Sequence, residues 1–166
     1  MKLIARSHFR YFNIFNSMKK SGIVQSIMLF FLLVSTLRLE AGPSVTDNHI
    51  KVDQFGYRCN DEKIAIISNP QTGFNAGSPF TPGTGANQYE VRNWADNVVV
   101  YSGTLVPWNA GNTHTQSGDK VWWFDFSSYT TPGTYYVYDV ARSVGSYKFE
   151  IRDDVYKEAL KQTVRS

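Results

Sequence analysis

The chain has 166 residues, enough for about one domain, and a formal net charge of +3. Residues 1–41 account for the positive charge, with six basic residues and one acidic residue, whereas the rest holds 11 basic and 13 acidic residues and has a net charge of −2. Because no run of lysine or arginine follows residue 41, the composition argues against a nucleic-acid-binding protein.

Residues 1–41 have the layout of a secretory signal peptide. A basic stretch at residues 18–20 precedes an apolar run over residues 23–37, and small residues follow at 41–43. A membrane-spanning helix needs about 20 apolar residues, so this shorter run favours export and cleavage over the alternative of a membrane anchor. Two details depart from the pattern. Leu39 and Glu40 are not the small residues expected before a cleavage site, and residues 1–17 are unusual in front of a signal peptide, so Met18 is an alternative start of translation.

Cys59 is the only cysteine in the chain. An exported domain with one thiol has no disulfide framework of its own. We expect Cys59 to be buried and inert; the alternative is a disulfide with a cysteine outside this sequence.

Seven segments after residue 48 have the composition of β-strands. Aromatic and β-branched residues are enriched in them, and glycine, proline and asparagine separate them. They are residues 50–54, 63–68, 89–92, 98–102, 121–126, 134–140 and 146–151. Seven short strands in about 100 residues predict an all-β fold, an immunoglobulin-like sandwich.

The layout of a tyrosine corner supports this fold. Tyr135 follows the Pro132-Gly133 turn at the start of a strand, and Val137 lies two residues on, where an immunoglobulin domain would have its second cysteine. Alternation along the strands predicts an aromatic core large enough to need no disulfide. Its expected members are Trp122, Phe124, Phe126, Tyr135, Val137, Tyr147, Phe149 and Ile151.

Two expected linkers are long for a sandwich. Residues 72–88 and 106–120 are both rich in glycine and asparagine. Loops of this length are usually functional, interface-forming or mobile.

The last expected element is an amphipathic helix over residues 153–165. Its apolar residues recur at helical spacing, and Asp153 or Asp154 is placed to cap its start. A lone helix of about a dozen residues is marginal in water, so this stripe predicts a partner surface. We interpret it as the first element of a second domain that the sequence does not contain.

No group of residues in this sequence indicates a catalytic or metal-binding site. Asp153 and Asp154 are adjacent and are explained by helix capping, and Asp119 and Asp125 flank a strand in turn or surface positions. The histidines after residue 41, His49 and His114, have no partner at metal-ligand spacing. The sequence therefore predicts no catalytic residues, no cofactor and no metal.

Aromatic residues are the candidate contact residues instead. Trp123, Tyr136 and Tyr138 are expected on the outward faces of their strands, and Trp108, like Trp94, lies in or near a loop. Exposed aromatic rings stack on sugars in carbohydrate-binding modules, or form an apolar patch that a neighbouring domain covers. The helix favours the neighbouring domain, and sugar contact remains the alternative.

The strand series resembles a known family. Residues 50–57 (IKVDQFGY) are similar to the I-x-V-(N/D)-Q-x-G-Y opening of the N-terminal Ig-like domain of family 9 glycoside hydrolases. The later segments resemble the following strands of that domain in order, and residues 156–161 (YKEALK) resemble the first helix of its catalytic domain. These segments are residues 63–65, 89–92, 99–103, 117–127, 132–135 and 146–151.

The resemblance implies a domain from an exported cellulase that packs beside an (α/α)6-barrel catalytic domain. The barrel's D-A-G-D stretch, which carries the catalytic aspartates, does not occur here, so no catalytic residue is transferred to this chain. The family's calcium sites also lie largely in the barrel. We therefore expect a leader over 1–41, the Ig-like domain over 42–152 and the first barrel helix over 153–166.

The expected role of such a chain is to support the catalytic barrel, and the expected partner is its own catalytic domain. We expect neither nucleic-acid binding nor stable membrane association after cleavage. The alternative is a free-standing secreted carbohydrate-binding or adhesion module, with cellulose or β-glucan as its ligand.

Overall fold

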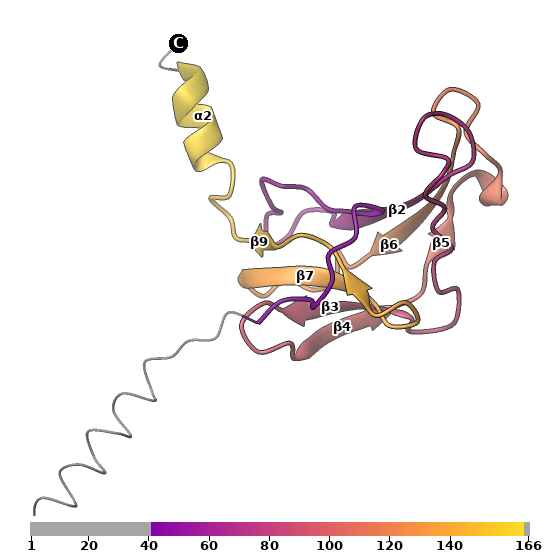
Figure 1. Ribbon diagram of the computed structural model, residues 1–166. Helices are drawn as coiled ribbons and strands as arrows, with labels where there is room; N and C mark the ends of the chain where they lie inside the picture. Colours follow the sequence, from indigo (N-terminus) through magenta and orange to yellow (C-terminus); the bar gives the residue numbers. More distant parts are fainter. Residues whose placement is uncertain (1–40, 165–166) are drawn as a thin grey trace, which may run out of the picture. The chain divides into compact units, whose positions relative to one another are not determined.

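The computed structural model describes residues 41–164, so residues 1–40 of the predicted leader lie outside the described residues (Figure 1). The described part is a sandwich of two antiparallel sheets. In the first sheet the order is β1 (Ile50–Lys51), β2 (Ile64–Pro70), β6 (Asp119–Asp125) and β5 (Val106–Pro107). In the second it is β4 (Val99–Gly103), β3 (Tyr89–Asn93), β7 (Gly133–Asp139) and β8 (Val144–Gly145), and β9 (Phe149–Ile151) also pairs with β7.

Strand alternation builds the core between the sheets. Phe124 of β6 and Phe126, which directly follows this strand, are fully buried, as are Tyr89 and Val91 of β3. The rings of Tyr89 and Phe124 meet across the sandwich with centroids 5.7 Å apart. Trp122 is half-buried at the edge of the same cluster. The predicted inward face of β6 is therefore confirmed.

The tyrosine corner is also confirmed. The Tyr135 hydroxyl lies 3.3 Å from the carbonyl oxygens of both Thr131 and Pro132, to which it can donate a hydrogen bond, and 3.1 Å from the Tyr129 hydroxyl. These contacts tie the start of β7 to the turn that precedes it. Burial and the Tyr129 hydroxyl raise the pKa of Tyr135.

The last predicted strand differs from the structure. Ser146 is fully buried, and its Oγ accepts a hydrogen bond from the Val137 amide at 2.9 Å. This side chain takes the inward place beside β7, so Tyr147 points outward and is 53% exposed. The prediction that Tyr147 belongs to the core is wrong, whereas Phe149 and Ile151 of the short β9 are buried as expected.

Both long linkers contain structure that alternation does not indicate. The 106–120 segment begins with β5 and continues as a 3-10 turn, η1 (Trp108–Gly111), in which Asn109 and Ala110 have positive φ angles of 47° and 53°. In the 72–88 segment, Phe80 is only 1% exposed and its amide donates to Asn69 Oδ1. This linker is thus anchored to the sandwich near its middle.

The C-terminal helix, α2 (Lys157–Val164), starts later than expected. Asp153 Oδ1 accepts from the Cys59 amide at 3.2 Å, and Asp154 pairs with Arg152, and neither residue stands next to Lys157, where the helix begins. Residues 153–156 form turns rather than helix. Between residues 41 and 164, no helix is long and apolar enough to cross a membrane.

Cys59 is buried and carries a free thiol. Burial raises the pKa of this thiol. A buried thiol of raised pKa is a poor nucleophile, which agrees with the expectation of an inert residue.

Candidate interdomain and ligand-contact surfaces

The structure separates the four candidate aromatic residues into two groups on different sheets. Trp123 lies on the outer face of the first sheet, opposite Ile66 of β2 and Val106 of β5. It is 41% exposed and Val106 is 57% exposed. Ile66, Trp123 and Val106 therefore form an apolar row across three strands, which we call the Trp123 row.

Trp108 is placed directly after β5, at the start of η1. It is half-buried, and its ring meets the ring of His114 edge-on with centroids 5.3 Å apart. Trp108 thus belongs to the loop end of the first sheet and packs partly on its own loop.

Tyr136 and Tyr138 lie on the outer face of the second sheet, but other side chains cover them. Tyr136 is 1% exposed, with the Trp94 ring packed edge-on against it, and its hydroxyl donates to Asn97 Oδ1 at 2.8 Å. The prediction that Tyr136 is an exposed contact residue is wrong, because alternation gives the face of a strand but not what covers that face. Burial raises the pKa of Tyr136.

Tyr138 is half-buried beneath a cation. The Arg92 guanidinium lies 3.8 Å from the centroid of its ring and pairs with Glu90 on the same strand. Stacking of a cation on an aromatic face is favourable, so a sugar would have to displace Arg92 to reach this ring. Of the candidates on strands, Trp123 is the one with an open face.

A second surface lies where the sandwich joins the helix, and we call it the junction. The turn over residues 53–57 (DQFGY) is closed by the Gly56 amide donating to the Asp53 carbonyl and by the Phe55 amide donating to Asp53 Oδ1 at 2.8 Å. Gly56 has a φ of 98°, and a Cβ at this position would lie 2.3 Å from the carbonyl oxygen of Glu150. Only glycine allows this approach to the end of β9.

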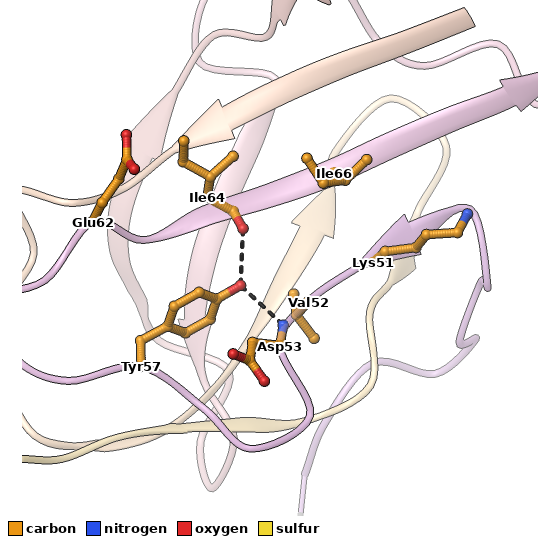
Figure 2. A pocket seen from close by; sticks show the side chains of 7 residues that line it. All are labelled: Lys51, Val52, Asp53, Tyr57, Glu62, Ile64 and Ile66. Atoms are coloured by element: carbon orange, nitrogen blue, oxygen red, sulfur yellow. Dashed lines mark hydrogen bonds between the residues drawn. The ribbon is translucent and has the colours of Figure 1, made fainter. Parts of the chain in front are cut away.

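Tyr57 fixes the other end of this turn (Figure 2). Its hydroxyl accepts a hydrogen bond from the Asp53 amide at 3.0 Å and donates one to the Ile64 carbonyl at 2.9 Å. The ring packs edge-on against Phe126 and Phe149 in the core, each with centroids 5.3 Å apart. Burial raises the pKa of Tyr57 to about 12.

A hollow of about 410 Å³ lies beside the Tyr57 hydroxyl. Figure 2 shows Ile64 and Ile66 of β2 on one side of it and Lys51 and Asp53 on the other, with Glu62 at one end. The hollow therefore combines an apolar wall with both an ammonium and carboxylates. Because Ile66 also belongs to the Trp123 row, the hollow adjoins that row.

The chain leaving β9 is attached to the same turn. Val155 is 5% exposed, and its Cγ2 would lie 2.7 Å from a Cβ on Gly56. The Tyr156 hydroxyl lies 3.2 Å from Asp53 Oδ2 and 3.1 Å from the Gly56 carbonyl, and the Tyr156 ring lies 6.3 Å from that of Phe55. Desolvation and the Asp53 carboxylate raise the pKa of Tyr156.

The apolar residues of α2 itself remain open. Leu160 is 63% exposed and Val164 is 87% exposed, and no residue of the helix is buried. Together with Phe55, which is 63% exposed, they give the junction its exposed apolar side chains. The strand pattern could not have revealed the role of Asp53 and Tyr156, because their contact joins residues 103 positions apart.

The paired aspartates singled out from the sequence have structural partners. Asp153 and Asp154 are engaged by the Cys59 amide and by Arg152, and no group of three or more metal-ligating side chains occurs within residues 41–164.

Comparison with known proteins gives the family. The sequence model described as "Cellulase N-terminal ig-like domain" matches residues 45–144. No curated protein is similar enough to count as a match.

Several solved structures are also similar to this chain. A metagenome-derived glycoside hydrolase family 9 endoglucanase shares 30% identity over 67% of this chain and 19% of its own, with a TM-score of 0.50. The family 9 endoglucanase J30 shares 28% identity over 65% of this chain and 17% of its own, with a TM-score of 0.49. A GH9 protein of Bacteroides ovatus shares 22% identity over 66% of this chain and 16% of its own, with a TM-score of 0.47.

The chain thus spans less than a fifth of these proteins. The family match covers more than half of the chain and includes strands β1 to β7. The chain belongs to the family of cellulase N-terminal Ig-like domains.

Proposed function

We propose that this chain is the accessory Ig-like module of a secreted family 9 glycoside hydrolase, and that its role is to support the catalytic domain. In this proposal residues 1–41 are the leader, residues 42–152 are the module and residues 153–166 begin an (α/α)6-barrel. The parent enzyme would hydrolyse β-1,4-glucosidic bonds outside the cell, and this chain alone would be inactive.

The junction is the observation that carries the proposal. Val155 and Tyr156 are bound to the 53–57 turn, while Leu160 and Val164 one and two helical turns later are exposed. A short helix with an open apolar stripe is marginal in water and gains stability from a partner surface. The similar solved proteins are endoglucanases of which this chain covers less than a fifth, which agrees with a catalytic domain as that partner.

Activity of the isolated chain tests the proposal directly. The purified chain is expected to release no reducing sugar from carboxymethylcellulose above a buffer blank. An active endoglucanase purified from the same host serves as the positive control, and an empty-vector preparation controls for host cellulase. Release above both blanks would refute the role as an inactive accessory module.

The supporting role is tested in the longer protein, if the reading frame continues past the Ser166 codon and reaches a D-A-G-D stretch. There, Phe55→Ser is expected to lower the melting temperature of the catalytic domain, because Phe55 packs beside Tyr156 at the junction. Phe74→Ser is the matched control, since Phe74 is a fully exposed phenylalanine in the 72–88 linker. Equal effects of the two changes would contradict the proposed role of the junction.

The Trp123 row favours a second candidate function, binding of a β-glucan. An open indole face beside a hollow with Lys51, Asp53 and Glu62 offers both an apolar platform and hydrogen-bonding groups, the combination that ligand sites use. This candidate predicts retardation of the chain in gels containing soluble β-glucan, abolished by Trp123→Ala and unaffected by Phe74→Ala. Unretarded migration of the unaltered chain would leave only the supporting role.

A further inference from the structure

His49 connects the segment before β1 to the 72–88 linker through both nitrogens of its ring. Nδ1 lies 2.6 Å from Asp47 Oδ1, and Nε2 lies 2.9 Å from the carbonyl oxygen of Ser78. The ring also stacks on Phe80, with centroids 4.9 Å apart and planes inclined by 10°. Asp47 in turn is held near β8, because its amide donates to the Gly145 carbonyl at 2.8 Å.

These contacts define the protonation state that the geometry accommodates. A carbonyl oxygen only accepts hydrogen bonds, and so does an ionised carboxylate. Asp47 Oδ1 already accepts the His49 amide at 2.8 Å, which marks it as an acceptor. A neutral imidazole has one N–H group and could satisfy only one of its two neighbours, whereas an imidazolium donates to both.

The elements packed near His49 carry further charged groups. On the linker side, the Arg142 guanidinium lies 4.8 Å from the Phe80 ring centroid, and its Nη1 donates to the Thr81 carbonyl at 3.1 Å. The buried Asp139 accepts from the Gly83 and Arg142 amides and from the Tyr89 hydroxyl. On the strand side, Lys51 interacts electrostatically with Asp119 and Asp47.

Loss of a proton from His49 would therefore leave one contact unmade. With Nε2–H kept toward Ser78, the lone pair of Nδ1 would face Asp47 Oδ1 at 2.6 Å, which is repulsive. With Nδ1–H kept toward Asp47, the Ser78 carbonyl would lose its donor. Loss of the hydrogen bond between His49 Nε2 and the Ser78 carbonyl is the outcome that releases the linker.

We propose that His49 is a pH-sensitive latch that, as an imidazolium, holds the part of the linker around Ser78 and Phe80 against the sandwich and releases it when the ring loses its proton. The proposal is independent of the proposed function, since it concerns only this chain's own fold. The linker is therefore expected to be held against the sandwich under acidic conditions and released under alkaline conditions.

Nuclear magnetic resonance on the isotopically labelled chain tests the latch. Spectra of the ring nitrogens recorded over a series of pH values should show both His49 nitrogens protonated at the acidic end. Over the pH range in which one proton is lost, the amide protection factors of Ser78 and Phe80, corrected for intrinsic exchange, should fall by roughly tenfold to a hundredfold. A neutral His49 ring at a pH where the linker is protected would overturn the proposal.

Two variants provide the controls. His49→Gln should make the protection of Phe80 independent of pH over this range. His114→Gln should leave the pH dependence intact, because His114 Nδ1 accepts a hydrogen bond from the Ser117 amide and its ring does not join distant segments in this way. If His49→Gln fails to fold, the wild-type titration alone decides, and protection that does not change as His49 titrates refutes the latch.

Discussion

Replacing Gly56 with alanine tests whether the 53–57 turn depends on close backbone approach. The new Cβ would lie 2.3 Å from the Glu150 carbonyl oxygen and 2.7 Å from Val155 Cγ2, and the residue would keep a φ of 98°. A residue with a side chain in such a backbone conformation costs about 1–3 kcal/mol.

The steric conflict adds a second cost. The Glu150 carbonyl accepts the Tyr57 amide at 2.8 Å, and moving it away leaves a buried donor unpaired, at about 1–3 kcal/mol. The two effects together predict a loss of about 2–6 kcal/mol in the free energy of unfolding. Local relaxation would place the result toward the lower end of this range.

Urea unfolding followed by tryptophan fluorescence measures this loss. The matched control is Gly77→Ala, because a Cβ on Gly77 has no neighbour within 4 Å and its φ lies outside the positive region. The control is expected to change the free energy of unfolding by less than about 0.5 kcal/mol. A Gly56→Ala effect no larger than that of Gly77→Ala would refute the reasoning.

Three further predictions concern side chains. Tyr135→Phe is expected to cost about 0.5–1.5 kcal/mol by urea unfolding, because it removes the hydroxyl of the tyrosine corner; no measurable cost would count against these contacts. The raised pKa of Tyr57, about 12, means that the unfolded chain loses this proton first, so stability should fall as the pH rises from about 10 toward 12. Thermal unfolding across this range should show a smaller decline for Tyr57→Phe, and an unchanged decline would contradict the assignment. Cys59 should react with a thiol reagent slowly in the native chain and rapidly in urea, and equal rates would show that the thiol is not buried.

Much of the fold could be predicted because alternation is a local property. Trp122 and Phe124 share a face of β6, which Phe126 continues just after the strand, and Tyr135 and Val137 share a face of β7, whatever lies opposite them. Tyr147 and Tyr136 show the limit of this reasoning. A buried Ser146, itself part of the predicted strand, takes the inward position next to Tyr147. Trp94, which lies outside the predicted strands, covers the outward face of Tyr136.

The candidate surfaces depended more on distant contacts. The sequence indicated an apolar stripe after Asp153 and predicted a helix from that residue. It could not show that the Asp153 carboxylate accepts a hydrogen bond from the Cys59 amide instead. It also gave no sign that Tyr156 contacts Asp53 or that His49 contacts Ser78. Side-chain hydrogen bonds between remote segments leave no periodicity in the sequence.

The sequence by itself determined the strand composition, the turn residues and the family resemblance, since each rests on short stretches of neighbouring residues. Only the tertiary structure decided which outward aromatic residues are open and which are covered. It also decided that the 53–57 turn receives the chain leaving β9, because a glycine there lets two backbones approach and no local pattern encodes the second backbone.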